Sequence, residues 1–150
     1  MIRVFLDANV YFAGTLSNQG ASAFLLQLAR RNKIHLVATR LVLLEADRNL
    51  RKKTSKKTVG AFHHFLRATK ISVLPSPTEK IMAKYEDVIH PKDVPVLAAA
   101  LEVPVDYLLT LDRKHFLTPR VISLGKKVRI MTPTDFLREF SGQKKDGSTT

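Results

Sequence analysis

Two aspartates stand where apolar segments of strand length end. The segment 2–6, IRVFL, runs into Asp7, and the segment 107–111, YLLTL, runs into Asp112. In an open parallel sheet, ligands bind in the crevice beyond the carboxyl ends of the strands. If these two strands lie close together in one sheet, their two carboxylates meet in that crevice.

Two further acids, Asp93 and Glu45, are candidates for the same crevice. Asp93 stands at the start of the segment KDVPVLAAALEV, which is typical of a helix with a capping acid. Glu45 lies within the predicted helix RLVLLEADRNLRKK, on the same face as Leu41 and Leu44. An acid beside an apolar stripe needs a partner, because burying an unpaired charge is costly.

Four carboxylates that share a crevice need a cation. Two carboxylates about 4 Å apart repel each other by roughly 4 kcal/mol at an effective dielectric constant of about 20. The chain has no cysteine, and oxygen ligands favour Mg²⁺ or Mn²⁺ over Zn²⁺. Such an ion generates hydroxide from water and stabilises the charge that develops on a phosphate. The four acids therefore predict metal-dependent hydrolysis of a phosphate ester.

Each acid also has a purely structural explanation. Asp7 and Asp93 can cap the turn or helix that follows them. The other two acids can pair with neighbours on their own segments, Asp112 with Arg113 or Lys114, and Glu45 with Arg48 or Asn49. The combination of four acids is more specific than any one of them.

Positive charge dominates the composition. The chain has 25 Lys and Arg against 13 Asp and Glu, which gives a formal net charge of +12. This excess favours a polyanionic partner, because each neutralised phosphate releases condensed counterions. The basic residues that we expect to contact such a substrate are Arg48, Arg51, Lys52, Lys53, Arg113 and Lys114. A solvated basic surface, or an acidic protein partner, is the alternative explanation.

Segments of strand length alternate with segments of helical period along the chain. Strands are expected at 2–6, 34–39, 70–76, 105–111 and 126–132, and helices at 21–31, 40–53, 56–68, 77–87, 92–103 and 133–140. This alternation predicts an α/β fold, a three-layer α/β/α sandwich with a mostly parallel central sheet. We expect residues 1–140 to form a single domain and the polar segment 141–150 to be disordered.

The composition also narrows the cellular setting. No segment approaches the roughly 20 apolar residues that cross a bilayer, and no signal peptide is expected at the N-terminus. The lack of cysteine excludes disulfides and thiol catalysis and fits a reducing compartment. We therefore expect a cytoplasmic protein with no membrane partner.

Four segments together resemble the PIN domain: FLDANVYFAG, RLVLLEADRNL, HPKDVPVLAAALEV and DYLLTLDRKHF. The ordered set is similar to that of bacterial and archaeal PIN-domain ribonucleases, including the VapC-type toxins of type II toxin–antitoxin pairs. The closing segment VRIMTPTDFLREF is similar to the end of that family. The resemblance thus covers nearly the whole chain before the polar tail.

This resemblance implies an endoribonuclease that depends on Mg²⁺ or Mn²⁺. It implies that the catalytic, metal-binding acids are Asp7, Glu45, Asp93 and Asp112. Asn9 and Thr110 match polar residues of the family that position water or the metal ligands. The family further implies RNA as the substrate, an antitoxin protein as a partner, and frequent formation of a homodimer.

Two functions of other classes stay open. The first is a nucleic-acid-binding module without catalysis, for example within an RNA-processing assembly. The second is aspartyl phosphotransfer, because LDANV has some similarity to the DxD start of haloacid-dehalogenase phosphatases. Asn9 occupies the second acidic position of that motif, which makes this second function a poor match.

Overall fold

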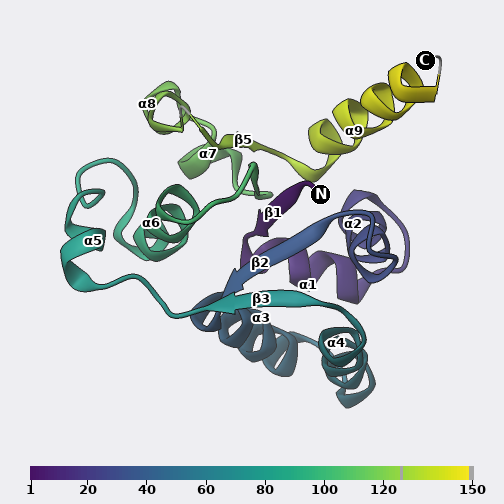
Figure 1. The fold of residues 1–150 in the computed structure, drawn as a ribbon. Coiled ribbons are helices and arrows are strands. Elements are labelled where there is room, and N and C mark those ends of the chain that lie inside the picture. Colours follow the sequence, from purple (N-terminus) through teal and green to yellow (C-terminus); the bar gives the residue numbers. More distant parts are fainter. Residues whose placement is uncertain (126, 149–150) are drawn as a thin grey trace.

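The fold is built around five parallel strands (Figure 1). The computed structural model describes residues 1–125 and 127–148, with backbone alone considered for 143–148. The strands, in the spatial order β3-β2-β1-β4-β5, are β3 (Ile71–Leu74), β2 (His35–Thr39), β1 (Arg3–Leu6), β4 (Tyr107–Leu109) and β5 (Arg129–Met131). The predicted parallel sheet is confirmed, and β1 and β4 are neighbours at its centre.

The central strands are mostly apolar because the sheet is covered on both faces. Val4, Phe5 and Leu6 of β1 are fully buried, as are Leu108 and Leu109 of β4. The edge strands β3 and β5 contain fewer buried residues: none in β3 and one in β5. The two acids that follow β1 and β4 therefore leave the sheet from its most buried part.

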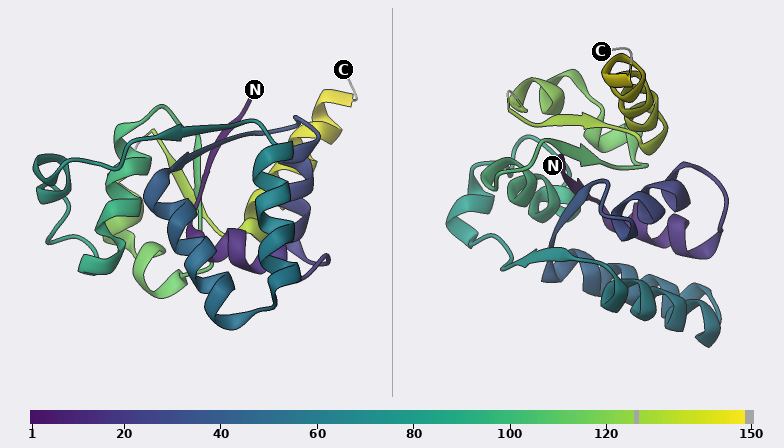
Figure 2. Two further views of the ribbon diagram at one scale, coloured as in Figure 1. Left: turned by 90° about the horizontal axis from the view of Figure 1, so that it is seen from below. Right: turned by 45° about the vertical axis from the view of Figure 1, so that its right-hand side comes forward.

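Helices cover the two faces of the sheet (Figures 1 and 2). One face carries α1 (Ala8–Leu16), α2 (Ala21–Arg30), α3 (Arg40–Lys53) and α4 (Lys56–Ala68). The other carries α5 (Glu79–Ala83), the 3-10 turn η1 (Pro91–Asp93), α6 (Val94–Glu102), α7 (Arg113–Phe116) and α8 (Pro119–Leu124). The last helix, α9 (Pro133–Ser148), packs against α2. The predicted three-layer α/β/α sandwich is confirmed.

Hydroxyl side chains fix the starts of several helices. Thr39 accepts a hydrogen bond from the backbone N–H of Val42 at 3.3 Å, and Ser55 accepts one from Thr58 at 3.2 Å. Such caps satisfy N–H groups that have no partner within the helix. Thr39 thus fixes the start of α3 directly after β2, and Ser55 fixes the start of α4 shortly after α3.

Helix α1 was not among the helices expected from the sequence. Val10 and Tyr11 are fully buried and Ala8 nearly so, because α1 packs between the sheet and helices α2, α3 and α4. A helix that is covered on most sides lacks the polar face that reveals a helical period. The start of α1 at Ala8 also makes Asp7 its N-cap.

The described part of α9 extends into the polar segment 141–150, for which disorder was expected. The domain boundary at residue 140 stays a prediction, and residues 149 and 150 lie outside the described residues. Residue 126, the first of the expected strand 126–132, also lies outside them. None of the described helices is both long and apolar enough to cross a membrane.

Candidate functional site

Asp7 leaves β1 and is held by three donors. Its Oδ1 accepts a hydrogen bond from the N–H of Ala8 at 2.8 Å. Its Oδ2 accepts one from the hydroxyl of Thr110 at 2.8 Å and one from the side-chain amide of Asn9 at 3.3 Å. Burial, together with the charges of Asp93 and Glu45, raises the pKa of Asp7 to about 6 despite the hydrogen bonds from Thr110 and Ala8, which lower it. Asp7 is therefore a cap, as the structural explanation held, and also a carboxylate that forms no ion pair within the described part of the chain.

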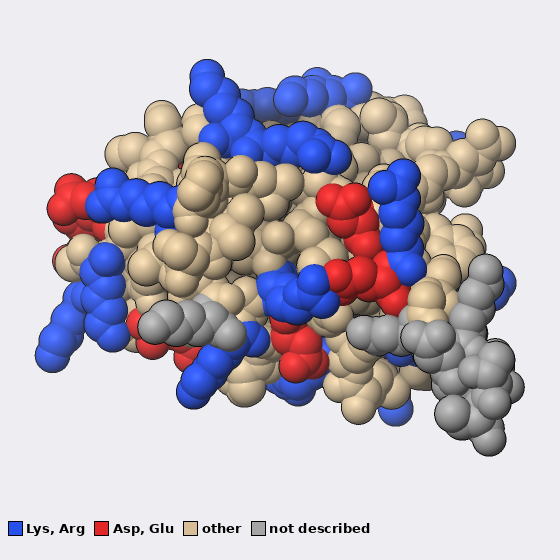
Figure 3. All heavy atoms as spheres, turned by 90° about the horizontal axis from the view of Figure 1, so that it is seen from above, with Lys and Arg blue, Asp and Glu red and all other residues tan. Residues whose placement is uncertain are grey.

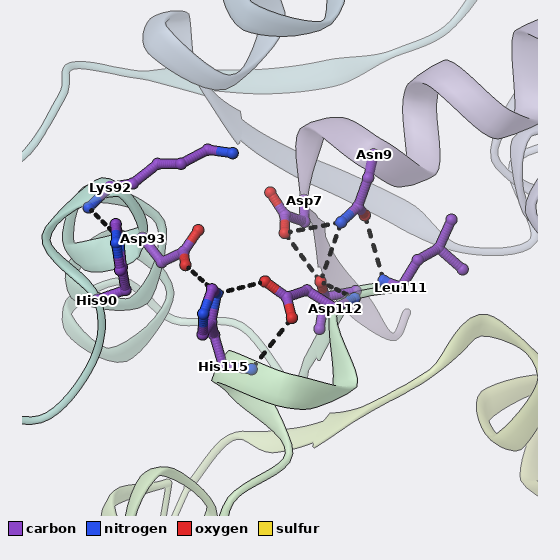
Figure 4. Close-up of polar contacts among 9 residues, drawn as sticks. Asp7, Asn9, His90, Lys92, Asp93, Leu111, Asp112 and His115 are labelled. Atoms are coloured by element: carbon purple, nitrogen blue, oxygen red, sulfur yellow. Dashed lines mark hydrogen bonds and ion pairs between the residues drawn. The ribbon is translucent and has the colours of Figure 1, made fainter.

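Thr110 and Asn9 connect the ends of β1 and β4 (Figure 4). The Thr110 hydroxyl, which donates to Asp7, accepts a hydrogen bond from the backbone N–H of Asp112 at 3.1 Å. The side-chain oxygen of Asn9 accepts one from the N–H of Leu111 at 3.2 Å. These bonds fix the backbone of Asp112 relative to the carboxylate of Asp7. The two acids that end neighbouring strands thus share one polar network, as their positions in the sequence predicted.

Asp93 and Asp112 meet at the imidazole of His115. The Nδ1 atom of His115 lies 3.0 Å from Asp93 Oδ2 and 2.9 Å from Asp112 Oδ2. Asp112 also caps α7, because its Oδ1 accepts a hydrogen bond from the N–H of His115 at 3.0 Å. Figure 4 shows the three side chains pointing toward one another from η1, from the end of the β4 segment and from α7. Within the described residues, the ion pair of Asp112 is with His115, and the expected alternatives Arg113 and Lys114 are exposed.

One oxygen of Asp93 is buried without a hydrogen bond. The residue is only 8% exposed, and its side chain does not cap α6, in contrast to the structural explanation. Although Oδ2 is close to Nδ1 of His115, the contact is not aligned as a hydrogen bond, so this oxygen has no hydrogen-bond partner among the described residues. Burial and the nearby charge of Asp112 raise the pKa of Asp93. This oxygen needs a proton or a cation.

Glu45 approaches the other acids from α3. Its charge contributes to the raised pKa of Asp7, and in the described residues it makes no ion pair with Arg48 and no hydrogen bond with Asn49. The expectation that Leu41 and Leu44 form a buried stripe beside it was wrong, because both are exposed. The buried face of α3 is instead formed by Val42, Ala46 and Leu50. Glu45 is half-buried at the edge of this face, on the side of Asp7.

The donor set fits a divalent ion. Ligand atoms of Asp93, Asp112 and His115 all lie within 4.8 Å of one another. The unpartnered oxygen of Asp93 and the raised pKa of Asp7 both indicate negative charge that the described residues do not balance. Carboxylate oxygens are the ligands that Mg²⁺ and Mn²⁺ prefer. Asp7 and Glu45 lie outside this closest group and border it.

Comparison with known families decides the kind of protein. A family model described as the PIN domain matches residues 3–114, which is most of the chain. The chain belongs to the PIN domain family. PIN domains are in general nucleases and typically depend on divalent metal ions, which agrees with the acidic cluster. A search of curated proteins found no significant match to the sequence.

Solved structures share the fold of this PIN domain at low sequence identity. VapBC2 from Rickettsia felis, bound to a DNA fragment from their promoter, is 16% identical with a TM-score of 0.59, covering 86% of this chain and 98% of that one. PAE2754 from Pyrobaculum aerophilum is 17% identical with a TM-score of 0.61, covering 91% and 88%. FitAcB from Neisseria gonorrhoeae is 17% identical with a TM-score of 0.58, covering 87% and 97%.

The basic residues expected to contact substrate lie on α3 and α7 of the PIN domain. Arg51 forms an ion pair with Asp47 at 2.7 Å, and the Nζ of Lys53 lies 5.7 Å from the ring centre of Phe12. The remaining candidates are exposed: Arg48, Lys52, Arg113 and Lys114. Lys and Arg side chains are also spread over the face drawn in Figure 3, so the positive charge is not confined to one patch.

Three residues beside the acids were not among the predicted metal ligands or the residues that position them. His115 was given no ligand role, although it lies three residues after Asp112, a spacing that puts both on one side of a helical turn. The ring of His90 stacks on that of His115, with ring centroids 5.2 Å apart. The charge of Lys92 lowers the pKa of Asp93, against the larger effect of burial. His90 and Lys92 lie three residues and one residue before Asp93 in the chain, but the stacking of His90 on His115 depends on the fold.

Proposed function

We propose that this PIN domain is a metal-dependent endoribonuclease that hydrolyses RNA phosphodiester bonds. The observation that carries the proposal is the buried, unpartnered oxygen of Asp93, in a residue whose ligand atoms lie within 4.8 Å of those of Asp112 and His115. A site used only for RNA binding gains nothing from concentrating acids, because phosphates repel carboxylates. A divalent cation resolves both the acid–acid and the acid–phosphate repulsion.

The metal would be held by Asp7, Asp93 and Asp112, with Glu45 completing the set or orienting water. When bound, Mg²⁺ or Mn²⁺ supplies an activated water and stabilises charge on the phosphate. Thr110 and Asn9 hold the carboxylate of Asp7 in one orientation, which reduces the rearrangement that ligand binding requires. With a pKa of about 6, Asp7 is ionised and ready to act as a ligand at neutral pH.

We propose that the exposed cations of α3 and α7 bind the RNA backbone. The residues are Arg48, Arg51, Lys52, Lys53, Arg113 and Lys114. The net charge of +12 favours association with any polyanion, and it makes the affinity for RNA strongly dependent on salt concentration. The ion pair of Arg51 with Asp47 does not prevent Arg51 from binding RNA, because exposed ion pairs contribute only about 0–1 kcal/mol to stability.

The test is cleavage of a structured RNA with Mg²⁺ or Mn²⁺, by the wild type, by Asp7→Asn and by Asp87→Asn. Asp87 is exposed and serves as the control for the loss of one carboxylate. We expect cleavage by the wild type and the control, and loss of cleavage with Asp7→Asn or EDTA. Equal cleavage by wild type and Asp7→Asn would refute the proposed catalytic site.

The high positive charge also fits a second function, a nucleic-acid-binding module without catalysis that acts in RNA processing. This alternative requires salt-sensitive RNA binding that persists in EDTA, with no metal-dependent cleavage. The same set of proteins decides between the two functions when binding and cleavage are measured side by side.

We propose further that the protein is a VapC-like toxin of a type II pair, acts in the cytoplasm, and forms a homodimer. Two of the similar structures, VapBC2 and FitAcB, are of proteins whose names denote such pairs. The exposed Leu41 and Leu44 beside Glu45 offer apolar surface that a protein partner can cover. Co-purification with the product of an adjacent small open reading frame tests the antitoxin, and light scattering tests the dimer.

A further inference from the structure

The imidazole of His115 occupies the centre of the acid pair formed by Asp93 and Asp112. Its Nδ1 lies 3.0 Å and 2.9 Å from one oxygen of each. These three ligand atoms, one from each residue, are within 4.8 Å of one another. A side chain that only faced solvent would not need this position. Nδ1 is placed where it can share an ion with both carboxylates.

The contact with Asp93 does not satisfy that carboxylate. Asp93 is 8% exposed as a whole residue and 12% in its side chain, and its buried Oδ2 faces Nδ1 of His115 without forming a hydrogen bond. The hydrogen bond of Nδ1 goes to Asp112. His115 as a donor therefore balances one acid of the pair and leaves the other without a partner. An ion held by both carboxylates and by the nitrogen lone pair would balance them together.

His90 holds the ring of His115 in place. The two imidazoles stack with ring centroids 5.2 Å apart and an interplanar angle of 22°. His90 is itself fixed, because its Nδ1 accepts a hydrogen bond from the N–H of Lys92 at 3.2 Å. A ligand that is already oriented loses little rotamer freedom when it binds an ion. His90 is thus a positioning residue for His115.

We infer that His115 is a direct nitrogen ligand of the divalent ion and biases the site toward a transition-metal ion such as Mn²⁺ over Mg²⁺. The inference rests on the proposed metal site and adds to its acids a ligand of a different kind. Mg²⁺ binds oxygen ligands and keeps several waters, so a nitrogen donor offers it little. Mn²⁺ also favours oxygen ligands and stands lowest in the affinity order of first-row transition ions, but it accepts an imidazole nitrogen more readily than Mg²⁺ does.

The experiment is pulsed electron paramagnetic resonance of Mn²⁺ bound to the wild type, His115→Gln and His64→Gln, with Mn²⁺ and Mg²⁺ affinities from calorimetry. His64 is exposed on α4 and is the control for loss of one imidazole. We expect ¹⁴N modulation from a bound imidazole in the wild type and in His64→Gln, and its loss in His115→Gln. We expect the Kd for Mn²⁺ to rise at least about tenfold in His115→Gln, while the Kd for Mg²⁺ changes much less.

Two results separate failure of this inference from failure of the metal site. Bound Mn²⁺ without ¹⁴N modulation in the wild type would overturn the nitrogen ligand and leave the acids as the site. Equal loss of Mn²⁺ and Mg²⁺ affinity in His115→Gln would overturn the bias toward transition metals. Absence of any bound Mn²⁺ would overturn the proposed metal site itself. The wild-type spectrum decides the ligand question even if the variant folds poorly.

Discussion

Replacing Asp7 by Asn removes the carboxylate whose pKa is raised to about 6, and this predicts a specific change in how stability depends on pH. The ordinary value for that group is 3.8. Since one pKa unit corresponds to 1.36 kcal/mol, the gap between folded and unfolded chain amounts to about 3 kcal/mol. Burial, the largest cause of the raised pKa, makes this a cost of keeping Asp7 ionised inside the folded protein.

The sign follows from which state binds the proton. Below pH 3.8 Asp7 is protonated in both states, and the folded protein bears no cost. Between pH 3.8 and about 6 the unfolded chain loses the proton while the folded protein keeps it, so the free energy of unfolding falls as pH rises. Above that window the whole cost of about 3 kcal/mol remains. Asn has no proton to lose, so Asp7→Asn lacks this decrease.

The assay is urea unfolding in EDTA at a series of pH values for the wild type, Asp7→Asn and the exposed control Asp87→Asn. At each pH we compare the free energy of unfolding of Asp7→Asn with that of the wild type. We expect this difference to shift by about 3 kcal/mol in favour of Asp7→Asn from the acid end to the neutral end of the series. A constant offset at all pH values reflects the altered hydrogen bonds with Ala8 and Thr110 and is not part of the prediction. Parallel curves for Asp7→Asn and the wild type would refute the raised pKa.

Three further predictions concern the ion, the polar network and the packing. At neutral pH, Mn²⁺ at about 100 times its Kd should raise the free energy of unfolding of the wild type by about 2.7 kcal/mol. The same Mn²⁺ concentration should raise the free energy of unfolding of Asp93→Asn much less. An equal increase in both proteins would mean that the ion binds elsewhere. Thr110→Val removes the hydroxyl shared by Asp7 and Asp112 and should cost about 1–3 kcal/mol in urea unfolding, whereas no cost would mean that the network is dispensable. Gly14→Ala should lower the melting temperature, because its Cβ would lie 2.8 Å from the backbone oxygen of Ser22; the control Gly60→Ala, with nothing within 4 Å, should gain about 0.5–1 kcal/mol.

The sheet and two of the acids were accessible from the sequence for a physical reason. Strands buried on both faces read as continuous apolar runs, so β1 and β4 could be located. The predicted end of β1 before Asp7 is correct, whereas β4 ends at Leu109, three residues before Asp112. Their proximity followed from the rule that ligand sites lie beyond the carboxyl ends of parallel strands. The hydrogen bonds through Thr110 connect them in the way that this rule predicts.

Features that depend on tertiary contacts were missed. The apolar residues of α3 are compatible with two different buried faces. The face with Leu41 and Leu44 was predicted to be apolar and buried, but it is exposed. Helix α1 escaped notice because burial on most sides removes its polar face. The contact between Asp93 and His115 joins residues from η1 and α7, which only the packing of the folded chain brings together.

Diffraction from crystals grown with Mn²⁺, measured at the manganese absorption edge, tests most directly whether the acids form one metal site. We expect an anomalous peak at bonding distance from carboxylate oxygens of Asp93 and Asp112, on the side that faces Asp7. A peak held by other residues, or none at that position while Mn²⁺ is bound in solution, would contradict this expectation.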